Sequence, residues 1–122
     1  MAGLSSSNGH AHMMGIQAEV EAPDLKHTEV HLGNNIAPGS FGWMVPISES
    51  RALVGTVSSN RPNGEIDQFL SSLQRMGKVN NLLRPIRRWG IPVKPISKTY
   101  CDRILVTGDA AGFAKPTTGG GI

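Results

Sequence analysis

The stretch FGWMVPISESRALVGTV, residues 41–57, decides the fold class of this chain. Its two apolar runs, residues 41–45 and 51–57, are separated by PISES, a linker whose length suits a β-hairpin. The second run is apolar at consecutive positions, which is typical of a strand with both faces covered. Antiparallel strands therefore form the centre of the expected fold.

Two segments before this hairpin alternate between apolar and polar residues with the period of a half-buried strand. In residues 16–21 the apolar positions are Ile16, Ala18 and Val20. In residues 28–32, Val30 and Leu32 share one face, opposite His27, Glu29 and His31. We expect these two segments to be strands that pair with each other.

A helix is expected after the turn at residues 60–64, because apolar residues recur at helical spacing: Ile66, Phe69, Leu70, Leu73 and Met76. Gly77 is placed to end it. Residues 79–86 indicate a short second helix, although Pro85 excludes a regular interior. Residues 91–96 contain two prolines and indicate an edge or irregular strand, whereas residues 104–106 are typical of a buried, parallel strand.

These elements predict an α+β fold, an antiparallel sheet of about four to six strands with one or two helices on one face. With 122 residues, of which 39% are hydrophobic and 17% charged, the chain fits one globular domain. Its single cysteine, Cys101, excludes an internal disulfide, and no apolar run is long enough to span a bilayer. We expect a cytoplasmic protein whose membrane contact, if it has any, is peripheral.

The net charge of +3 arises from 12 Lys and Arg against 9 Asp and Glu, and half of the basic residues fall within residues 84–103. A phosphate-bearing ligand, an anionic membrane surface or a simple solvated face all fit this stretch. Aromatic residues are not interleaved with it, so no nucleic acid partner is expected.

The four histidines lie in a pair, His10 and His12, and on the strand face that carries His27 and His31 beside Glu29. A closed zinc site needs about four well-placed ligands. The pattern is more typical of solvent-facing polarity, and we predict no metal site.

The segment DRILVTGDAAG, residues 102–112, places an apolar strand directly before a turn of small residues. Gly108 and the residues around it let a ligand approach the backbone, and Asp109 can accept hydrogen bonds from a polyol. A buried Asp109 that caps the following turn is the structural alternative. Pro116-Thr117-Thr118 then leads into three glycines, Gly119, Gly120 and Gly121, as expected where a helix begins and attracts an anion.

Taken together, GDAAG at residues 108–112 and KPTTGGGI at residues 115–122 resemble the second flavin motif of the geranylgeranyl reductase family, FAD-dependent oxidoreductases of the hydroxylase-like flavoprotein superfamily. The resemblance implies that Asp109 binds the ribityl chain of FAD. It also implies that Gly108, Pro116 and the glycine triplet contribute to the flavin site.

PGSFGWMVP, residues 38–46, is similar to the Pro-x-x-Tyr-x-Trp-x-Phe-Pro signature of the same family, with Phe41 in place of Tyr and Val45 in place of Phe. The resemblance implies that Phe41, Trp43 and Val45 line an isoprenoid site. They lie at every second position and share one strand face. That apolar face also suits packing against the helix expected at residues 66–76.

The implied activity is reduction of carbon–carbon double bonds in geranylgeranyl or other isoprenoid lipids, with FAD as the cofactor. Alternatives are a related flavoprotein monooxygenase, an electron-transfer dehydrogenase, or a lipid-binding module without flavin. Residues 1–14 are expected to be a flexible N-terminal segment, residues 15–101 the substrate-binding sheet, and residues 102–122 part of an FAD-binding domain.

No Gly-x-Gly-x-x-Gly fingerprint occurs in the sequence. We therefore expect an internal piece of a longer protein, which on its own is inactive and binds FAD weakly. An exposed strand edge at residues 104–106 would favour self-association into a homo-oligomer.

Overall fold

The computed structural model describes residues 12–37, 39–58 and 64–115. The chain forms two compact units, Met14–Trp89 and a smaller one that combines Met1–Met13 with Gly90–Ile122. The N-terminal segment predicted to be flexible lies largely outside the described residues, and the domain boundary expected at residue 101 stays a prediction.

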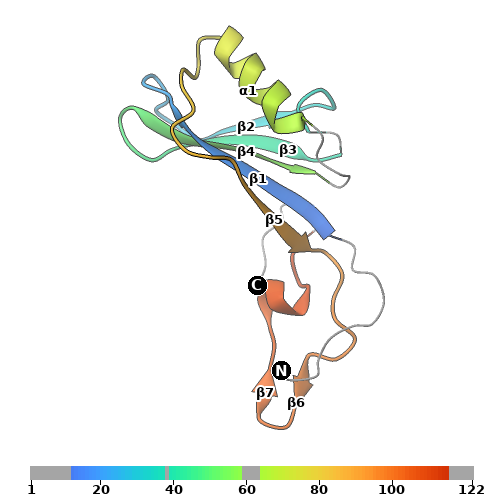
Figure 1. Cartoon of the computed structure of the whole chain (residues 1–122). Coiled ribbons are helices and arrows are strands. Elements are labelled where there is room, and N and C mark those ends of the chain that lie inside the picture. Colours follow the sequence, from blue (N-terminus) through green and yellow to red (C-terminus); the bar gives the residue numbers. More distant parts are fainter. Residues whose placement is uncertain (1–11, 38, 59–63, 116–122) are drawn as a thin grey trace. The chain divides into compact units, whose positions relative to one another are not determined.

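The larger unit is built on a five-stranded sheet in the order β2-β3-β4-β1-β5, with α1 lying over one face (Figure 1). Every pair with a defined register is antiparallel. This confirms the α+β prediction. The elements are β1 His12–Glu21, β2 Glu29–Leu32, β3 Phe41–Pro46, β4 Arg51–Ser58, α1 Glu65–Arg75 and β5 Arg87–Pro92.

Strands β3 and β4 form the predicted hairpin, but the predicted pairing of the two upstream segments is wrong. β2 pairs with β3, and β1 pairs with the other edge of β4. The β1–β4 register places Ala18 opposite Val54 and Val20 opposite Ala52. All four are buried, so this pairing completes one continuous apolar face.

The core lies between that face and α1, and Phe69 is its largest side chain, only 1% exposed. The edge of its ring meets the His31 ring at a centroid distance of 5.1 Å. A Cβ at Gly42 would lie 2.8 Å from Phe69 Cε1, so the glycine makes room for the ring. The core cluster comprises Ala18, Val20, Ala22, Met44, Ala52, Val54, Phe69, Leu73 and Val79.

The end of α1 confirms the role predicted for Gly77. Gly77 adopts a left-handed conformation with φ 71° and donates its N–H to the Gln74 carbonyl at 3.0 Å. The Lys78 N–H reaches back to the Leu73 carbonyl at 2.9 Å. These two bonds form a Schellman motif, which requires a residue that tolerates positive φ.

The second helix predicted at residues 79–86 is wrong, because this segment runs extended along the edge of β1. Glu21 exchanges backbone hydrogen bonds with Asn80 and Asn81 at 2.8 and 2.9 Å, and the Leu83 N–H donates to the Glu19 carbonyl at 2.8 Å. Backbone N–H and C=O groups of this segment thus pair with the open edge of β1, whereas in a helix they would have paired with each other. The chain continues into β5, which is an edge strand as expected but begins four residues before the predicted segment 91–96 and ends at Pro92.

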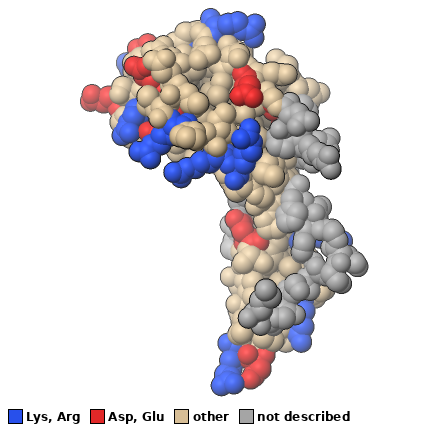
Figure 2. All heavy atoms as spheres, in the orientation of Figure 1, with Lys and Arg blue, Asp and Glu red and all other residues tan. Residues whose placement is uncertain are grey.

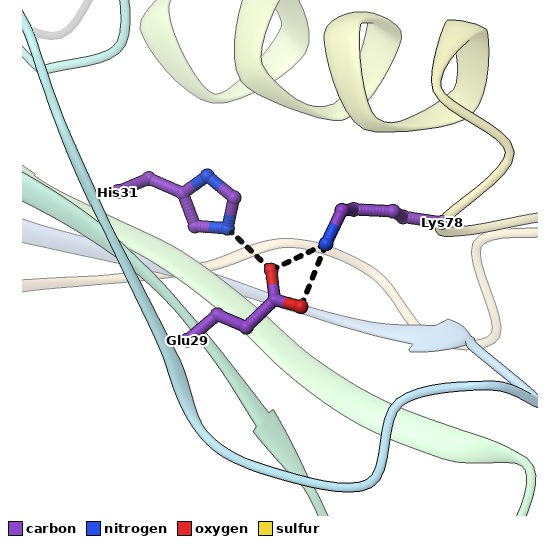
Figure 3. Close-up of polar contacts among 3 residues, drawn as sticks. All are labelled: Glu29, His31 and Lys78. Atoms are coloured by element: carbon purple, nitrogen blue, oxygen red, sulfur yellow. Dashed lines mark hydrogen bonds and ion pairs between the residues drawn. The ribbon is translucent and has the colours of Figure 1, made fainter.

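β2 alternates as predicted, but its apolar residues face outward: Val30 is 62% exposed and Leu32 74%. Glu29 and His31 lie on the side of α1 instead. Lys78 Nζ donates to both Glu29 carboxylate oxygens at 2.6 and 2.7 Å, and His31 Nε2 lies 3.0 Å from Glu29 Oε2 (Figure 3). The carboxylate therefore ties edge strand β2 to the end of α1.

The hydrogen bonds from Lys78 hold the pKa of the Glu29 carboxyl below its ordinary value. Because the pKa is lower in the folded state, this group stabilises the fold above its unfolded pKa, and the contribution disappears as pH falls through the folded pKa. We expect Glu29→Gln to lower the free energy of unfolding at pH 7 by less than about 1 kcal/mol, since both partners are partly exposed. Urea unfolding at a series of pH values measures this.

The same difference should vanish once the pH falls below the lowered pKa of the folded Glu29 carboxyl, because the wild-type group is then protonated as well. Glu49→Gln, in the exposed β3–β4 loop, is the matched control and should change stability at neither pH. A loss for Glu29→Gln that persists unchanged at low pH would mean that the ion pair is not its source.

In the smaller unit, β6 Tyr100–Cys101 and β7 Ile104–Leu105 form a two-stranded antiparallel hairpin, followed by the 3-10 helix η1 Gly108–Ala111. The prediction of a buried parallel strand at residues 104–106 is wrong within the described residues: Ile104 is 42% exposed and Leu105 72%. The tight turn through Arg103, with φ 61°, brings the strand back onto its immediate predecessor.

Candidate functional site

The face of the sheet opposite α1 carries Phe41, Trp43 and Val45, all half-buried. The residues between them, Gly42 and Met44, are buried on the helix side. The alternative that Phe41, Trp43 and Val45 pack against α1 is therefore wrong. Their assignment to an isoprenoid site stays a prediction. Because they face away from α1, the helix does not cover them.

Neighbouring strands extend this apolar wall, since directly paired residues of antiparallel strands share a face. Val30 pairs with Trp43, Leu32 with Phe41, and Leu53 with Val45. The Phe41 and Trp43 rings lie 5.9 Å apart between centroids. We call these six residues the open face: Val30, Leu32, Phe41, Trp43, Val45 and Leu53.

Sequence reasoning missed three members of the open face, Val30, Leu32 and Leu53. The alternation in residues 28–32 was visible, but an apolar row is normally assigned to the core. Only the pairing of β2 with β3 shows that Val30 and Leu32 belong beside Trp43 and Phe41.

Two glycines allow the tryptophans to lie close against the sheet. A Cβ at Gly55 would lie 2.5 Å from Trp43 Cε2 and 2.6 Å from the Ile16 carbonyl oxygen. A Cβ at Gly15 would lie 2.6 Å from Trp89 Cζ2, so Trp89 also lies on the side of the open face. Trp89 is 41% exposed and was not predicted as a site residue, because its glycine partner is remote in sequence.

The second group of predicted site residues begins at η1. Asp109 is exposed, and within the described residues its carboxylate makes no capping hydrogen bond. The alternative of a buried Asp109 that caps the turn is therefore wrong. Gly108 adopts positive φ, 61°, as a turn of small residues requires. Pro116 and Gly119–Gly121 lie outside the described residues, so their place beside Asp109 stays a prediction.

Gly112 fixes this turn against a neighbouring loop. Its φ of 76° is left-handed, and a Cβ there would lie 2.7 Å from the Lys94 carbonyl carbon and 3.0 Å from Pro95 Cα. The Ile96 N–H donates to the Ala111 carbonyl at 3.0 Å. Two backbone segments meet here at a distance that only glycine permits, which holds Asp109 on an ordered turn.

Within residues 12–37, 39–58 and 64–115, no group of three or more His, Cys, Asp or Glu side chains is placed to hold a metal ion. Glu29 is instead joined to His31 and to Lys78. No helix in the described ranges has the length and hydropathy to cross a membrane.

Comparison with known proteins gives consistent relatives, although no family model matches the chain. It is 39% identical over 109 residues to a digeranylgeranylglycerophospholipid reductase of Methanocaldococcus jannaschii, covering 84% of the chain and 27% of the relative. The reductase of the same name from Methanococcus vannielii is 34% identical over 131 residues, which cover 99% of the chain and 33% of that relative. The chain thus spans about a third or less of their length.

Two solved structures share its fold. A geranylgeranyl bacteriochlorophyll reductase-like protein from Thermoplasma acidophilum matches with a TM-score of 0.73 at 24% identity, covering 92% of this chain and 30% of that one. CmlS, a flavin-dependent halogenase, matches with a TM-score of 0.58 at 17% identity, covering 89% and 22%. The chain therefore shares its fold with part of a reductase-like protein and with part of a flavin-dependent halogenase.

More narrowly, the chain belongs to the geranylgeranyl reductase family. The predicted resemblance of the chain to this family is thereby confirmed, whereas the roles implied for the residues of its two motifs stay predictions.

Proposed function

We propose that this chain supplies the substrate wall and part of the flavin site of an enzyme that reduces carbon–carbon double bonds in geranylgeranyl chains of lipids. The observation that carries the proposal is the open face, an aromatic and aliphatic surface turned away from the core that α1 covers. The relatives named digeranylgeranylglycerophospholipid reductases support an isoprenoid lipid as the molecule that covers it.

The open face would hold an apolar chain and exclude water from it. Trp43 lies against Gly55, so its indole is supported from beneath by the sheet. Phe41 and Val45 flank it on the same strand face, and Val30 and Leu32 extend the surface on β2. Burial of these exposed groups by an isoprenoid chain would contribute about 25 cal/mol per Å² of apolar surface.

The described part of the flavin site fits FAD in its chemistry. Asp109 offers an exposed carboxylate without a capping role, which can accept hydrogen bonds from the hydroxyls of a ribityl chain. Gly108, with Pro116 and Gly119–Gly121 of the family motif, would contact the same cofactor. Bound FAD would supply the hydride for reduction of the double bond.

The test uses the protein at the length of its relatives, supplied with digeranylgeranylglycerophospholipid and a reductant. We expect mass spectrometry to show addition of two hydrogens per reduced double bond. Asp109→Ala should weaken FAD binding at least about tenfold, because a ligand hydrogen bond to a charged group is worth about 1.5 to 3 kcal/mol, and its flavin content should fall accordingly.

Asp102→Ala is the matched control, since Asp102 is also an exposed aspartate of the smaller unit but pairs with Arg103 in the β6–β7 turn. It should keep its flavin. Full flavin content in Asp109→Ala would contradict the cofactor role. Addition of oxygen instead of hydrogen would identify a monooxygenase, and unchanged lipid would contradict reductase activity.

A further inference from the structure

A pocket of about 320 Å³ opens at one end of the open face, where the β3–β4 turn lies beside the segment that leads into β5. Leu53 of the open face lines it, together with Ile47 of the turn. Its charged walls are three arginines and one carboxylate: Arg51, Arg84, Arg87 and Glu19. The pocket thus joins an apolar surface to a group of basic side chains.

The charges in this pocket do not cancel. Glu19 Oε1 accepts a hydrogen bond from Arg51 at 3.0 Å, and Glu19 Oε2 lies 3.0 Å from Arg84 Nε. One carboxylate therefore balances two guanidinium groups, and each guanidinium has five N–H donors, most of which remain available. Arg87 forms no ion pair with the rest of the described chain. Three positive charges against one negative charge leave an excess of two.

Figure 2 shows that Lys and Arg side chains gather along one side of the unit that contains α1. A partly enclosed pocket with excess guanidinium donors favours an anion, and phosphate groups are suited to bidentate binding by arginine. A carboxylate that already holds two of the arginines keeps them in place before the anion arrives.

The register of the sheet determines how the pocket is connected to the open face. Leu53, in the pocket, pairs with Val45 on β3, and Trp43 and Phe41 follow at steps of two residues. Each step of two residues advances about 6.4 to 6.8 Å along a strand. The apolar wall therefore extends about 13 Å from Val45 to Phe41.

We propose that the pocket binds the anionic head group of the isoprenoid substrate, while its hydrocarbon chain lies along Val45, Trp43 and Phe41. This inference rests on the proposed function, because it assigns the polar end of the same substrate. The occupant is a phosphate covalently joined to an isoprenoid chain, rather than free phosphate. The arginine end then fixes the direction in which the chain enters.

The test is a binding titration with the 122-residue chain, followed by the fluorescence of its two tryptophans, Trp43 and Trp89, both on the side of the open face. The ligands are geranylgeranyl phosphate, uncharged geranylgeraniol and inorganic phosphate. We expect the phosphorylated isoprenoid to bind at least about tenfold more tightly than the alcohol, with an affinity that falls as salt increases.

Arg87→Gln should weaken binding of geranylgeranyl phosphate about tenfold and leave geranylgeraniol unaffected. Arg88→Gln is the matched control, because Arg88 is the next residue on β5, is exposed and faces the opposite side of the strand. It should change neither affinity. Circular dichroism checks that both variants remain folded.

Equal affinity for the phosphate and the alcohol, or equal losses in Arg87→Gln and Arg88→Gln, would overturn the head-group site. Inorganic phosphate that competes as strongly as geranylgeranyl phosphate would also overturn it, by indicating a site for free anions. Arginine-dependent binding without hydrogenation in the longer protein would support the head-group site and refute only the proposed function.

Discussion

Phe69→Ala is expected to lower the free energy of unfolding of the larger unit by about 3 to 5 kcal/mol. The ring is 1% exposed and fills the space between α1 and the sheet above Gly42. Its removal leaves a cavity that the β3–β4 hairpin cannot close, and it also ends the contact with His31. A small domain has a total stability of about 5 to 15 kcal/mol, so a large part would be lost.

Urea unfolding followed by tryptophan fluorescence measures this loss. Phe41→Ala is the matched control, because the same truncation occurs on the open face, where the ring is half-buried. We expect it to cost less than half as much stability but to weaken isoprenoid binding. A Phe69→Ala variant within about 1 kcal/mol of the wild type would contradict the core described above.

Gly55→Ala is expected to be the most damaging single change to the open face, costing about 1 to 3 kcal/mol. The added Cβ would overlap both the Trp43 ring and the Ile16 carbonyl oxygen, as its distances of 2.5 and 2.6 Å show. The ring can rotate away, whereas the carbonyl belongs to β1, whose Ile16 pairs with Thr56. Both the aromatic wall and the β1–β4 pairing are therefore disturbed.

A double-mutant cycle separates these two effects. In a Trp43→Ala background, Gly55→Ala should cost about 1 kcal/mol less than in the wild type, because only the backbone overlap remains. Stability is measured by urea unfolding followed by circular dichroism, since Trp43 is changed. An identical cost in both backgrounds would mean that the indole does not lie against Gly55.

The sequence by itself determined most of strands β1 to β4 and where α1 lies, because side-chain periods of two and 3.6 residues are local properties. It also determined the end of α1, since Gly77 tolerates the left-handed conformation that a Schellman motif requires. The motifs at residues 38–46 and 108–122 were sufficient to indicate the family.

Only the tertiary structure decided which strands pair and which face is covered. Alternation in β2 shows that Val30 and Leu32 share a face, but the partner strand decides that this face is the open one. Residues 79–86 likewise do not form the predicted helix, because their backbone groups hydrogen-bond to the free edge of β1. The arginine pocket joins β1, β4 and the approach to β5, which are far apart in sequence, so no local pattern contains it. Such a site forms only when distant segments pack together, and the local periodicity of the sequence does not specify which segments pack.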